Sequence, residues 1–253
     1  MNIVVFIKQV PDTTDVKWTA NNNIDRANTE SVLNPVDKEA LEAAIKLKEK
    51  YNAKVTAVSM GPNKAIEVLK EAIALGADDA ALLNDSKFIG SDTCATSKVL
   101  ASAVKAKFSS ADLLLFGQSA SDGETAQTGP STAVRFNYPC ITHVNEIKEY
   151  TDGEVTVNSE TETEIVTYKV KLPAVLCLHN SIYTPSLPKI KGYIRAHDYN
   201  YKIYNNFEID LKEDEAGVKG SPTYVSKVYK MQENRNCKML NTAEILEKIK
   251  EVG

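Results

Sequence analysis

Cysteine and histidine are scarce and widely spaced in this sequence of 253 residues. The cysteines, Cys94, Cys140, Cys177 and Cys237, form no Cys-x-x-Cys pair, and the three histidines show no metal-ligand spacing. In a chain of this length without an export signal, such thiols are expected to stay reduced. We therefore predict neither a disulfide framework nor a metal site. No side chain is predicted to act as a general base or nucleophile.

Long apolar runs and blocks of positive charge are also missing. The longest apolar stretches, 2–7 and 172–178, have the length of strands and fall far short of the roughly 20 residues of a membrane span. The N-terminus lacks the basic region and the small-residue cleavage site of a secretory signal. The net charge is −4, and no cluster of Lys or Arg stands out. These absences predict a cytoplasmic protein that neither inserts into a membrane nor binds nucleic acid.

Familiar nucleotide-binding motifs are absent too. No Gly-x-Gly-x-x-Gly follows the first expected strand, where residues 7–12 read IKQVPD. The chain also has no Gly-x-x-x-x-Gly-Lys-Ser/Thr and no Ser-Gly-Gly run of the kind seen in ATP pyrophosphatases. The sequence therefore disfavours a Rossmann dehydrogenase and a P-loop ATPase.

Apolar strands and amphipathic helices alternate through the first half of the chain. The content of 43% hydrophobic and 25% charged residues is that of a globular protein able to build a core. We expect strands at 3–8, 54–60, 79–83 and 111–116, and helices at 36–50, 63–75 and 91–108. This alternation predicts an open, mostly parallel, doubly wound α/β sheet with helices on both faces.

The pattern changes after about residue 140. Alternation with period two around the turn at 151–154 predicts an antiparallel extension of the sheet, and 172–180 reads as a central strand. Residues 181–235 have weak periodicity and predict an extended arm that packs outside its own domain, before a final helix at 241–251. We accordingly divide the chain into an α/β domain, 1–180, and a C-terminal segment, 181–253.

Residues 117–130 read GQSASDGETAQTGP, without one Lys or Arg, directly after a buried-looking strand. Open parallel sheets bind ligands beyond the carboxyl ends of their strands, which places this stretch beside 6–10 and 60–63. Main-chain amides, a helix dipole and hydroxyls can hold a phosphate there without a cation. Gly123 and Gly129 would allow close approach, and the polar side chains available are Thr125, Gln127, Thr128 and Ser131. Composition alone leaves open whether the stretch binds an anion or is a solvated loop.

Two further features have a functional and a structural interpretation. Asn34, Pro35 and Asp37 form a strong start signal for the first helix, with Asn34 as its cap. Leu187 stands between Pro185 and Pro188, so a stiff loop either presents it as a docking residue or packs it down. Composition alone favours the packed leucine.

Seven colinear stretches resemble the beta (small) subunit of electron-transfer flavoproteins, and together they cover essentially the whole chain. They are VVFIKQVPDT (4–13), NPVDKEALEAAIKLKEK (34–50), VTAVSMGP (55–62), AIALGAD (72–78), DLLLFGQSASDGETAQTGP (112–130), KLPAVLCL (171–178) and PSLPKIKGYIRA (185–196). The resemblance implies that 1–180 is a nucleotide-binding domain with an adenine-nucleotide alpha hydrolase-like sheet. It implies that 181–253 contains a recognition loop and a C-terminal arm around a larger alpha subunit. It also implies that Leu187 and the loop 181–196 dock an acyl-CoA or similar dehydrogenase.

The same resemblance implies an adenine nucleotide in this subunit, either FAD or AMP. The contacts it implies are Phe6, Asn34, Asp37, Met60, Gly117, Gln118, Ser119, Ala120, Ser121, Asp122, Gly123, Glu124, Thr125, Ala126, Gln127 and Thr128. Residues 122–130 and the IKQVPDT start are similar to flavin-based electron-bifurcating members, which favours FAD. Gln118, Ser119 and Ser121 depart from the usual bifurcating pattern.

The expected function is therefore that of an electron-carrier subunit. It would pass electrons from NADH to a partner dehydrogenase, with bifurcation to ferredoxin. Two other interpretations are a non-bifurcating subunit that binds AMP and a stand-alone regulator that binds an adenine nucleotide.

Overall fold

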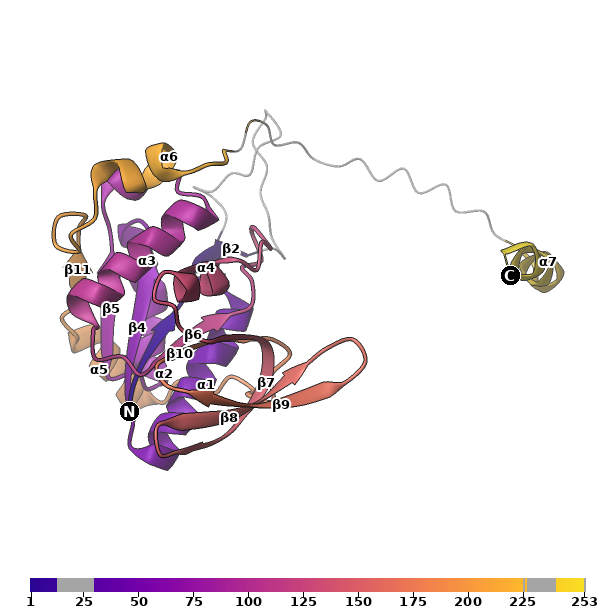
Figure 1. Cartoon of the computed structure of the whole chain (residues 1–253), viewed down its shortest axis with the longest axis horizontal. Coiled ribbons are helices and arrows are strands. Elements are labelled where there is room, and N and C mark those ends of the chain that lie inside the picture. Colours follow the sequence, from indigo (N-terminus) through magenta and orange to yellow (C-terminus); the bar gives the residue numbers. More distant parts are fainter. Residues whose placement is uncertain (13–29, 225, 227–239, 253) are drawn as a thin grey trace.

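The computed structural model describes residues 1–12, 30–224, 226 and 240–252, so Cys237 and part of the predicted arm lie outside the described residues. Its centre is a nine-stranded sheet with the order β11-β5-β4-β1-β6-β10-β7-β8-β9 (Figure 1). The strands are β1 (Asn2–Phe6), β4 (Lys54–Met60), β5 (Asp79–Leu83), β6 (Leu113–Gly117), β7 (Cys140–Thr151), β8 (Glu154–Glu160), β9 (Ile165–Lys171), β10 (Ala174–Leu178) and β11 (Lys202–Tyr204).

All neighbours from β11 to β7 pair in parallel, while β8 and β9 continue the sheet in antiparallel fashion. The predicted mostly parallel sheet with an antiparallel extension is therefore confirmed. A separate two-stranded antiparallel ladder, β2 (Gln9–Pro11) with β3 (Ser31–Leu33), was not predicted.

Helices cover both faces of the sheet, and the alternation of side chains along the central strands explains why. The helices are α1 (Pro35–Tyr51), α2 (Ile66–Leu75), α3 (Thr93–Lys107), α4 (Thr128–Val134), α5 (Ile190–Asp198), α6 (Gly217–Gly220) and α7 (Thr242–Val252), with 3₁₀ turns η2 (Asn63–Ala65), η3 (Ser86–Phe88) and η4 (Glu213–Glu215). Ile3 and Val5 of β1 point into one apolar cluster with α1 and α2, while Val4 and Phe6 point into the opposite cluster with α3 and α4.

Residues 190–204, expected to be part of an extended arm, pack on the same sheet. Arg195 of α5 donates hydrogen bonds to the carbonyls of Ile73 and Ala77 at the end of α2. β11 pairs with β5 at the sheet edge, where Lys202 is bonded to Asp79 at 2.8 Å. Contact of the remaining arm with a partner stays a prediction.

The last helix, α7, was predicted with Asn241 as its cap, and the structure confirms it. The side-chain Oδ1 of Asn241 accepts from the amide of Glu244 at 3.1 Å, and the Glu244 carboxylate accepts from the amide of Asn241 at 2.9 Å. This reciprocal pair is a capping box.

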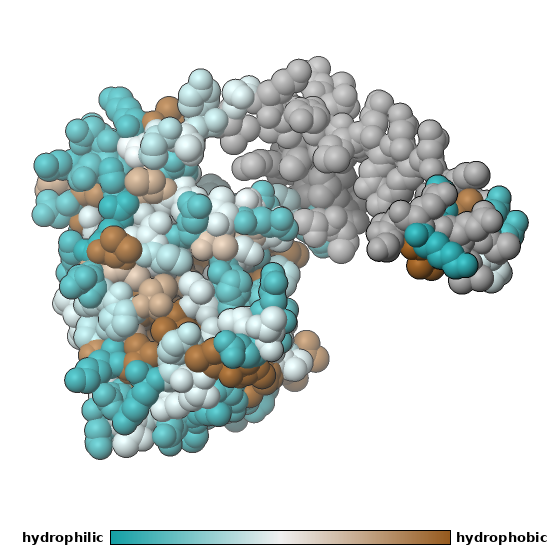
Figure 2. Space-filling view, turned by 45° about the vertical axis from the view of Figure 1, so that its right-hand side comes forward, coloured by the Kyte–Doolittle hydropathy of each residue, from teal (hydrophilic) through white to brown (hydrophobic). Residues whose placement is uncertain are grey.

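None of the helices in the described part of the chain combines the length and the apolar character that crossing a membrane requires. No group of three or more His, Cys, Asp or Glu residues within it is placed to hold a metal ion. Apolar side chains do reach the surface, and Figure 2 shows them as separate patches on the α/β body.

Candidate functional site

One carboxylate, that of Asp37 at the start of α1, is bonded both to the carboxyl end of β6 and to the segment that follows β1. Its Oδ2 accepts from the amide of Lys8 at 2.8 Å, and its Oδ1 accepts from the amide of Gly117 at 3.1 Å. Asp37 is 7% exposed. Burial, the largest contribution, raises the pKa of Asp37 to about 7, against the opposing hydrogen bonds from Lys8, Asn34 and Gly117. A single side chain thus ties a strand, a helix and the predicted binding loop together.

Asn34 does not cap α1 with its side chain, contrary to our prediction. Only its main-chain carbonyl takes part in the helix, by accepting from the amide of Lys38 at 3.0 Å. The fully buried side chain instead reaches the loop after β6: Nδ2 donates to the carbonyl of Ser119 at 2.9 Å, and Oδ1 accepts from the amide of Ser121 at 3.2 Å. The sequence signal was correct for the helix start but wrong for the role of the amide.

The Asn34 bonds lead to a testable expectation. In N34A the amide of Ser121 and the carbonyl of Ser119 lose their partners, so the free energy of unfolding should fall by about 2–3 kcal/mol. N34D is the informative comparison, because it keeps an acceptor for Ser121 but places a buried carboxylate oxygen against the carbonyl of Ser119. Urea unfolding near neutral pH should therefore show N34D to be at least as destabilised as N34A. Equal stability of N34A and the parent would contradict this assignment.

Two glycines of this region have packing roles that the sequence did not indicate. A Cβ on Gly117 would overlap Asp37 Oδ1 and lie 2.7 Å from the Asp37 amide nitrogen, so this glycine lets β6 approach α1. A Cβ on Gly129 would overlap the Cys177 sulfur, so Gly129 lets α4 pack against β10. A Cβ on Gly123 would meet nothing within 4 Å.

Left-handed backbone in the loop falls on two residues that are not glycine. Glu124 has a φ of 49° and Ala126 a φ of 52°. Such conformations are unfavourable for residues with a Cβ and concentrate at functional sites. Amides that follow one another through alternating right- and left-handed residues form concavities that bind anions. The loop therefore has a backbone feature of the kind found in anion-binding concavities, which the sequence did not indicate.

Other predicted contacts can offer a ligand only part of their surface. The Phe6 side chain is 5% exposed and stacked on Phe116 at 4.6 Å between ring centroids, so only its main chain is available. Met60 is half-buried against the same cluster. The side-chain oxygen of Gln118 accepts from the main-chain amide of His143 at 3.0 Å, and the main-chain amide of Gln118 donates to the carbonyl of Leu178. Gln118 thus fixes the loop to its neighbouring strands.

The remainder of the loop is open at the surface. Residues 122–125 and Gln127 are exposed, while Ser119, Ala120, Ser121, Ala126 and Thr128 are partly buried. The Thr93 hydroxyl, at the start of α3, donates to the hydroxyl of Thr125 at 3.3 Å.

A cation that sequence reasoning missed lies beside the loop. Lys8 Nζ is 2.6 and 2.9 Å from the two carboxylate oxygens of Asp122. Lys8 belongs to the segment after β1, so the loop itself still contributes no positive charge. Only the fold could reveal this pair, because 114 positions separate its members.

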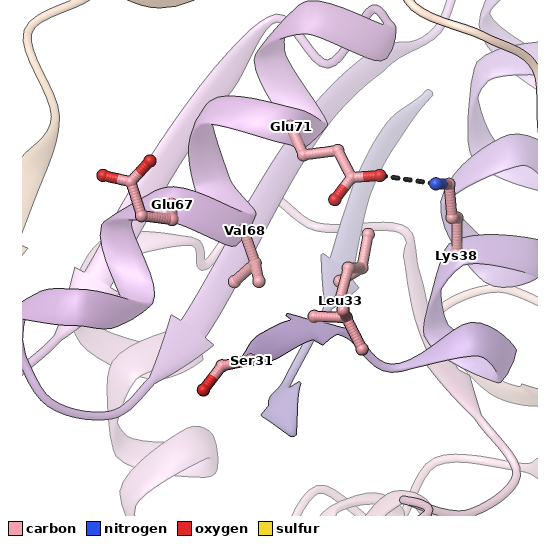
Figure 3. A pocket seen from close by; sticks show the side chains of 7 residues that line it. Ser31, Leu33, Lys38, Glu67, Val68 and Glu71 are labelled. Atoms are coloured by element: carbon pink, nitrogen blue, oxygen red, sulfur yellow. Dashed lines mark hydrogen bonds and ion pairs between the residues drawn. The ribbon is translucent and has the colours of Figure 1, made fainter. Parts of the chain in front are cut away.

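Leu187 lies on a different loop and is 88% exposed, so the packed-down interpretation does not hold. A hollow of about 230 Å³ lies elsewhere, between β3, α1 and α2, and none of the predicted contacts lines it (Figure 3). The ion pair between Lys38 and Glu71, 2.5 Å long, crosses its rim.

Comparison with known proteins places the chain in a family. Residues 22–198 match the electron transfer flavoprotein domain. The electron transfer flavoprotein subunit beta of Thermoanaerobacterium thermosaccharolyticum is 40% identical over 227 residues, covering 89% of this chain and 86% of that protein. The CarD subunit of the caffeyl-CoA reductase-Etf complex of Acetobacterium woodii is 39% identical over 227 residues, with the same two coverages. The acryloyl-CoA reductase electron transfer subunit gamma of Anaerotignum propionicum is 34% identical over 237 residues, covering 90% and 88%. The resemblance found in the sequence is confirmed: this chain belongs to the electron transfer flavoprotein family, among its beta subunits.

Proposed function

We propose that this chain is the small subunit of a heterodimer with an electron transfer flavoprotein alpha subunit, and that it holds FAD at the carboxyl edge of its sheet. Electrons from NADH would reach a partner dehydrogenase through the complex, with bifurcation to ferredoxin. The names of the caffeyl-CoA and acryloyl-CoA reductase relatives support a complex with a dehydrogenase or reductase.

The observation that carries this proposal is the strained, tied-down loop after β6. Asn34 and Asp37 hold its first residues, and left-handed backbone at Glu124 and Ala126 shapes its middle. The amides of Ser121, Gly123 and Glu124 already donate to Asn34 Oδ1 and to the carbonyl of Ala120. Under the proposal, the amides of residues 125–128 bind the phosphates, and the hydroxyls of Thr125 and Thr128 complete the shell. Lys8 balances the negative charge of Asp122 at the site.

The redox step is the chemistry that bound FAD supplies. The residues of this chain orient the cofactor through main-chain contacts at Phe6 and Met60 and through the loop. Leu187 provides an apolar contact for the dehydrogenase.

Identification of the bound nucleotides tests the proposal. The complex with its alpha subunit is purified and denatured, and the released nucleotides are separated by chromatography and counted per heterodimer. Two flavins per heterodimer are expected, one of them from this chain. One flavin with one AMP would make the chain an AMP-binding, non-bifurcating subunit. A monomer that carries an adenine nucleotide but no flavin would support the stand-alone regulator and overturn the heterodimer.

A further inference from the structure

The segment from 181 to 194, called the display segment here, leads from the end of β10 into α5 and exposes large apolar side chains in close succession. Its most exposed member is Leu187, at 88%. The others with more than half of their surface exposed are Ile182, Ile190, Tyr193 and Ile194. Scattered apolar side chains on a protein surface need no explanation, but such a series within fourteen residues indicates an interaction surface.

The first half of the display segment is held to α1 by two glutamate–serine contacts of the same kind. Glu39 Oε2 accepts from both the amide and the hydroxyl of Ser181, at 2.9 and 2.8 Å. One turn further along α1, the Glu42 carboxylate accepts from the amide and the hydroxyl of Ser186, at 3.1 and 2.8 Å. Each carboxylate thus holds one serine by both of its donors, and the two serines bracket residues 182–185.

Further contacts fix the backbone beneath the exposed side chains. The hydroxyl of Tyr183 accepts from the amide of Ile147 at 2.9 Å and donates to its carbonyl at 3.1 Å. A Cβ on Gly192 would overlap the carbonyl oxygen of Ala74, so α5 lies directly against α2. The prolines at 185 and 188 restrict the backbone on both sides of Leu187. The segment is therefore ordered along its length while its apolar side chains remain in water.

The carboxylate of Glu42 is buried, which is unusual for a side chain that holds a surface loop. It is 2% exposed, and a buried carboxylate is unfavourable unless it is paired and hydrogen-bonded. The cost of burying this charge is offset by the two hydrogen bonds from Ser186 and by the ion pair with Lys46 Nζ at 3.5 Å. Fixing a loop in advance of binding removes the entropy loss that ordering would otherwise impose on the complex.

The charge around the display segment indicates the chemistry of its partner. Residues 181–197 contain no Asp or Glu, whereas Lys189 and Lys191 are exposed beside Leu187 and Ile190. An apolar surface with a basic rim is complementary to an apolar depression with an acidic rim.

From these contacts we infer that Glu39 and Glu42 are positioning residues, which hold the display segment in the conformation that docks a partner dehydrogenase. The docking site on the dehydrogenase is an apolar depression with an acidic rim. This inference rests on the proposed function. It adds the α1 glutamates, which do not touch the partner, as determinants of docking.

The test uses the complete complex and the double variant E39A/E42A. Hydrogen–deuterium exchange of the peptide covering 181–188 should become at least about tenfold faster, since the segment loses its α1 acceptors. With a purified acyl-CoA dehydrogenase as the electron acceptor, KM should rise about tenfold while kcat stays unchanged, because only the pre-ordering of the surface is lost. Reduction of the dye dichlorophenolindophenol, which needs no docked protein, should also stay unchanged.

Three comparison variants sharpen the result. E49A removes an exposed glutamate from the same helix and should change neither exchange nor KM. S181A/S186A keeps both amide donors and should give a smaller rise in KM even if E39A/E42A folds poorly. E42Q retains one acceptor for Ser186 and should fall between E42A and the parent protein.

The outcomes separate this inference from the proposed function. If L187A raises KM but E39A/E42A changes neither KM nor the exchange of 181–188, the positioning role is overturned and the function stands. If neither variant changes KM, docking through this segment is overturned. The nucleotide count of the complex decides the subunit assignment separately.

Discussion

Replacing Gly117 by alanine should destabilise the native state by about 3 kcal/mol, the upper range for forcing atoms into a packed interior. The new methyl group would overlap Asp37 Oδ1 and lie 2.7 Å from the Asp37 amide nitrogen and 2.8 Å from the Val36 carbonyl carbon. These are backbone and buried atoms at the start of α1, so no flexible side chain can move aside. The separation of β6 from α1 would also weaken the bond from the Gly117 amide to Asp37.

Gly123, in the same loop, provides a matched control. A Cβ at this position meets nothing within 4 Å, so G123A should change the stability by no more than about 0.5 kcal/mol. Urea unfolding gives the stabilities, and the nucleotide content of the purified complex gives the consequence for binding. G117A should purify with little nucleotide, because the loop after β6 is displaced from α1. Equal behaviour of the two variants would show that β6 does not depend on close approach to α1.

The central layers of this fold could be predicted because their signals are local. Strands β4 and β5 begin and end at the predicted residues 54–60 and 79–83, and α1 extends the predicted 36–50 by one residue at each end. Helical spacing of apolar residues and runs of buried strand residues are properties of a short window of sequence. They do not depend on which distant element covers them.

The elements that were not predicted depend on distant partners. β11 has three residues and is held at the sheet edge by pairing with β5 and by the bond from Lys202 to Asp79. The small ladder of β2 with β3 is equally short. In such cases the tertiary contact and not the local sequence determines the conformation.

For the site, sequence patterns located the region but not its internal contacts. The position after β6 followed from the rule that parallel sheets bind ligands at their carboxyl edge. The bonds from Asn34 to the loop span 85 and 87 positions, and the pair of Lys8 with Asp122 spans 114. No sequence window contains both members of such pairs, and left-handed backbone at Glu124 and Ala126 contradicts their own conformational preferences.

Asp37 should make the protein less stable as the pH rises from about 4 to 7. Burial, the largest contribution, raises its folded-state pKa from the ordinary 3.8 to about 7. Between these values the folded state binds a proton that the unfolded state has lost. The stability from this group is therefore fully present below pH 3.8 and is lost as the pH rises through 7. A shift of this size corresponds to about 4 kcal/mol over the window.

The variant D37N isolates this effect because an asparagine does not titrate. The difference in unfolding free energy between the parent protein and D37N should fall by about 1.4 kcal/mol per pH unit between pH 4 and 7 and be flat above pH 8. Asp79, Asp85 and Asp92 also have shifted pKa values, but they are present in both proteins, so their contributions cancel from the difference in unfolding free energy. For each of them the hydrogen bonds that it accepts outweigh burial, the largest single contribution, so its pKa lies below the ordinary value. A difference that stays constant from pH 4 to 7 would mean that the amides of Lys8 and Gly117 keep Asp37 ionised throughout, and that the junction of β1, β6 and α1 is held by a permanent charge.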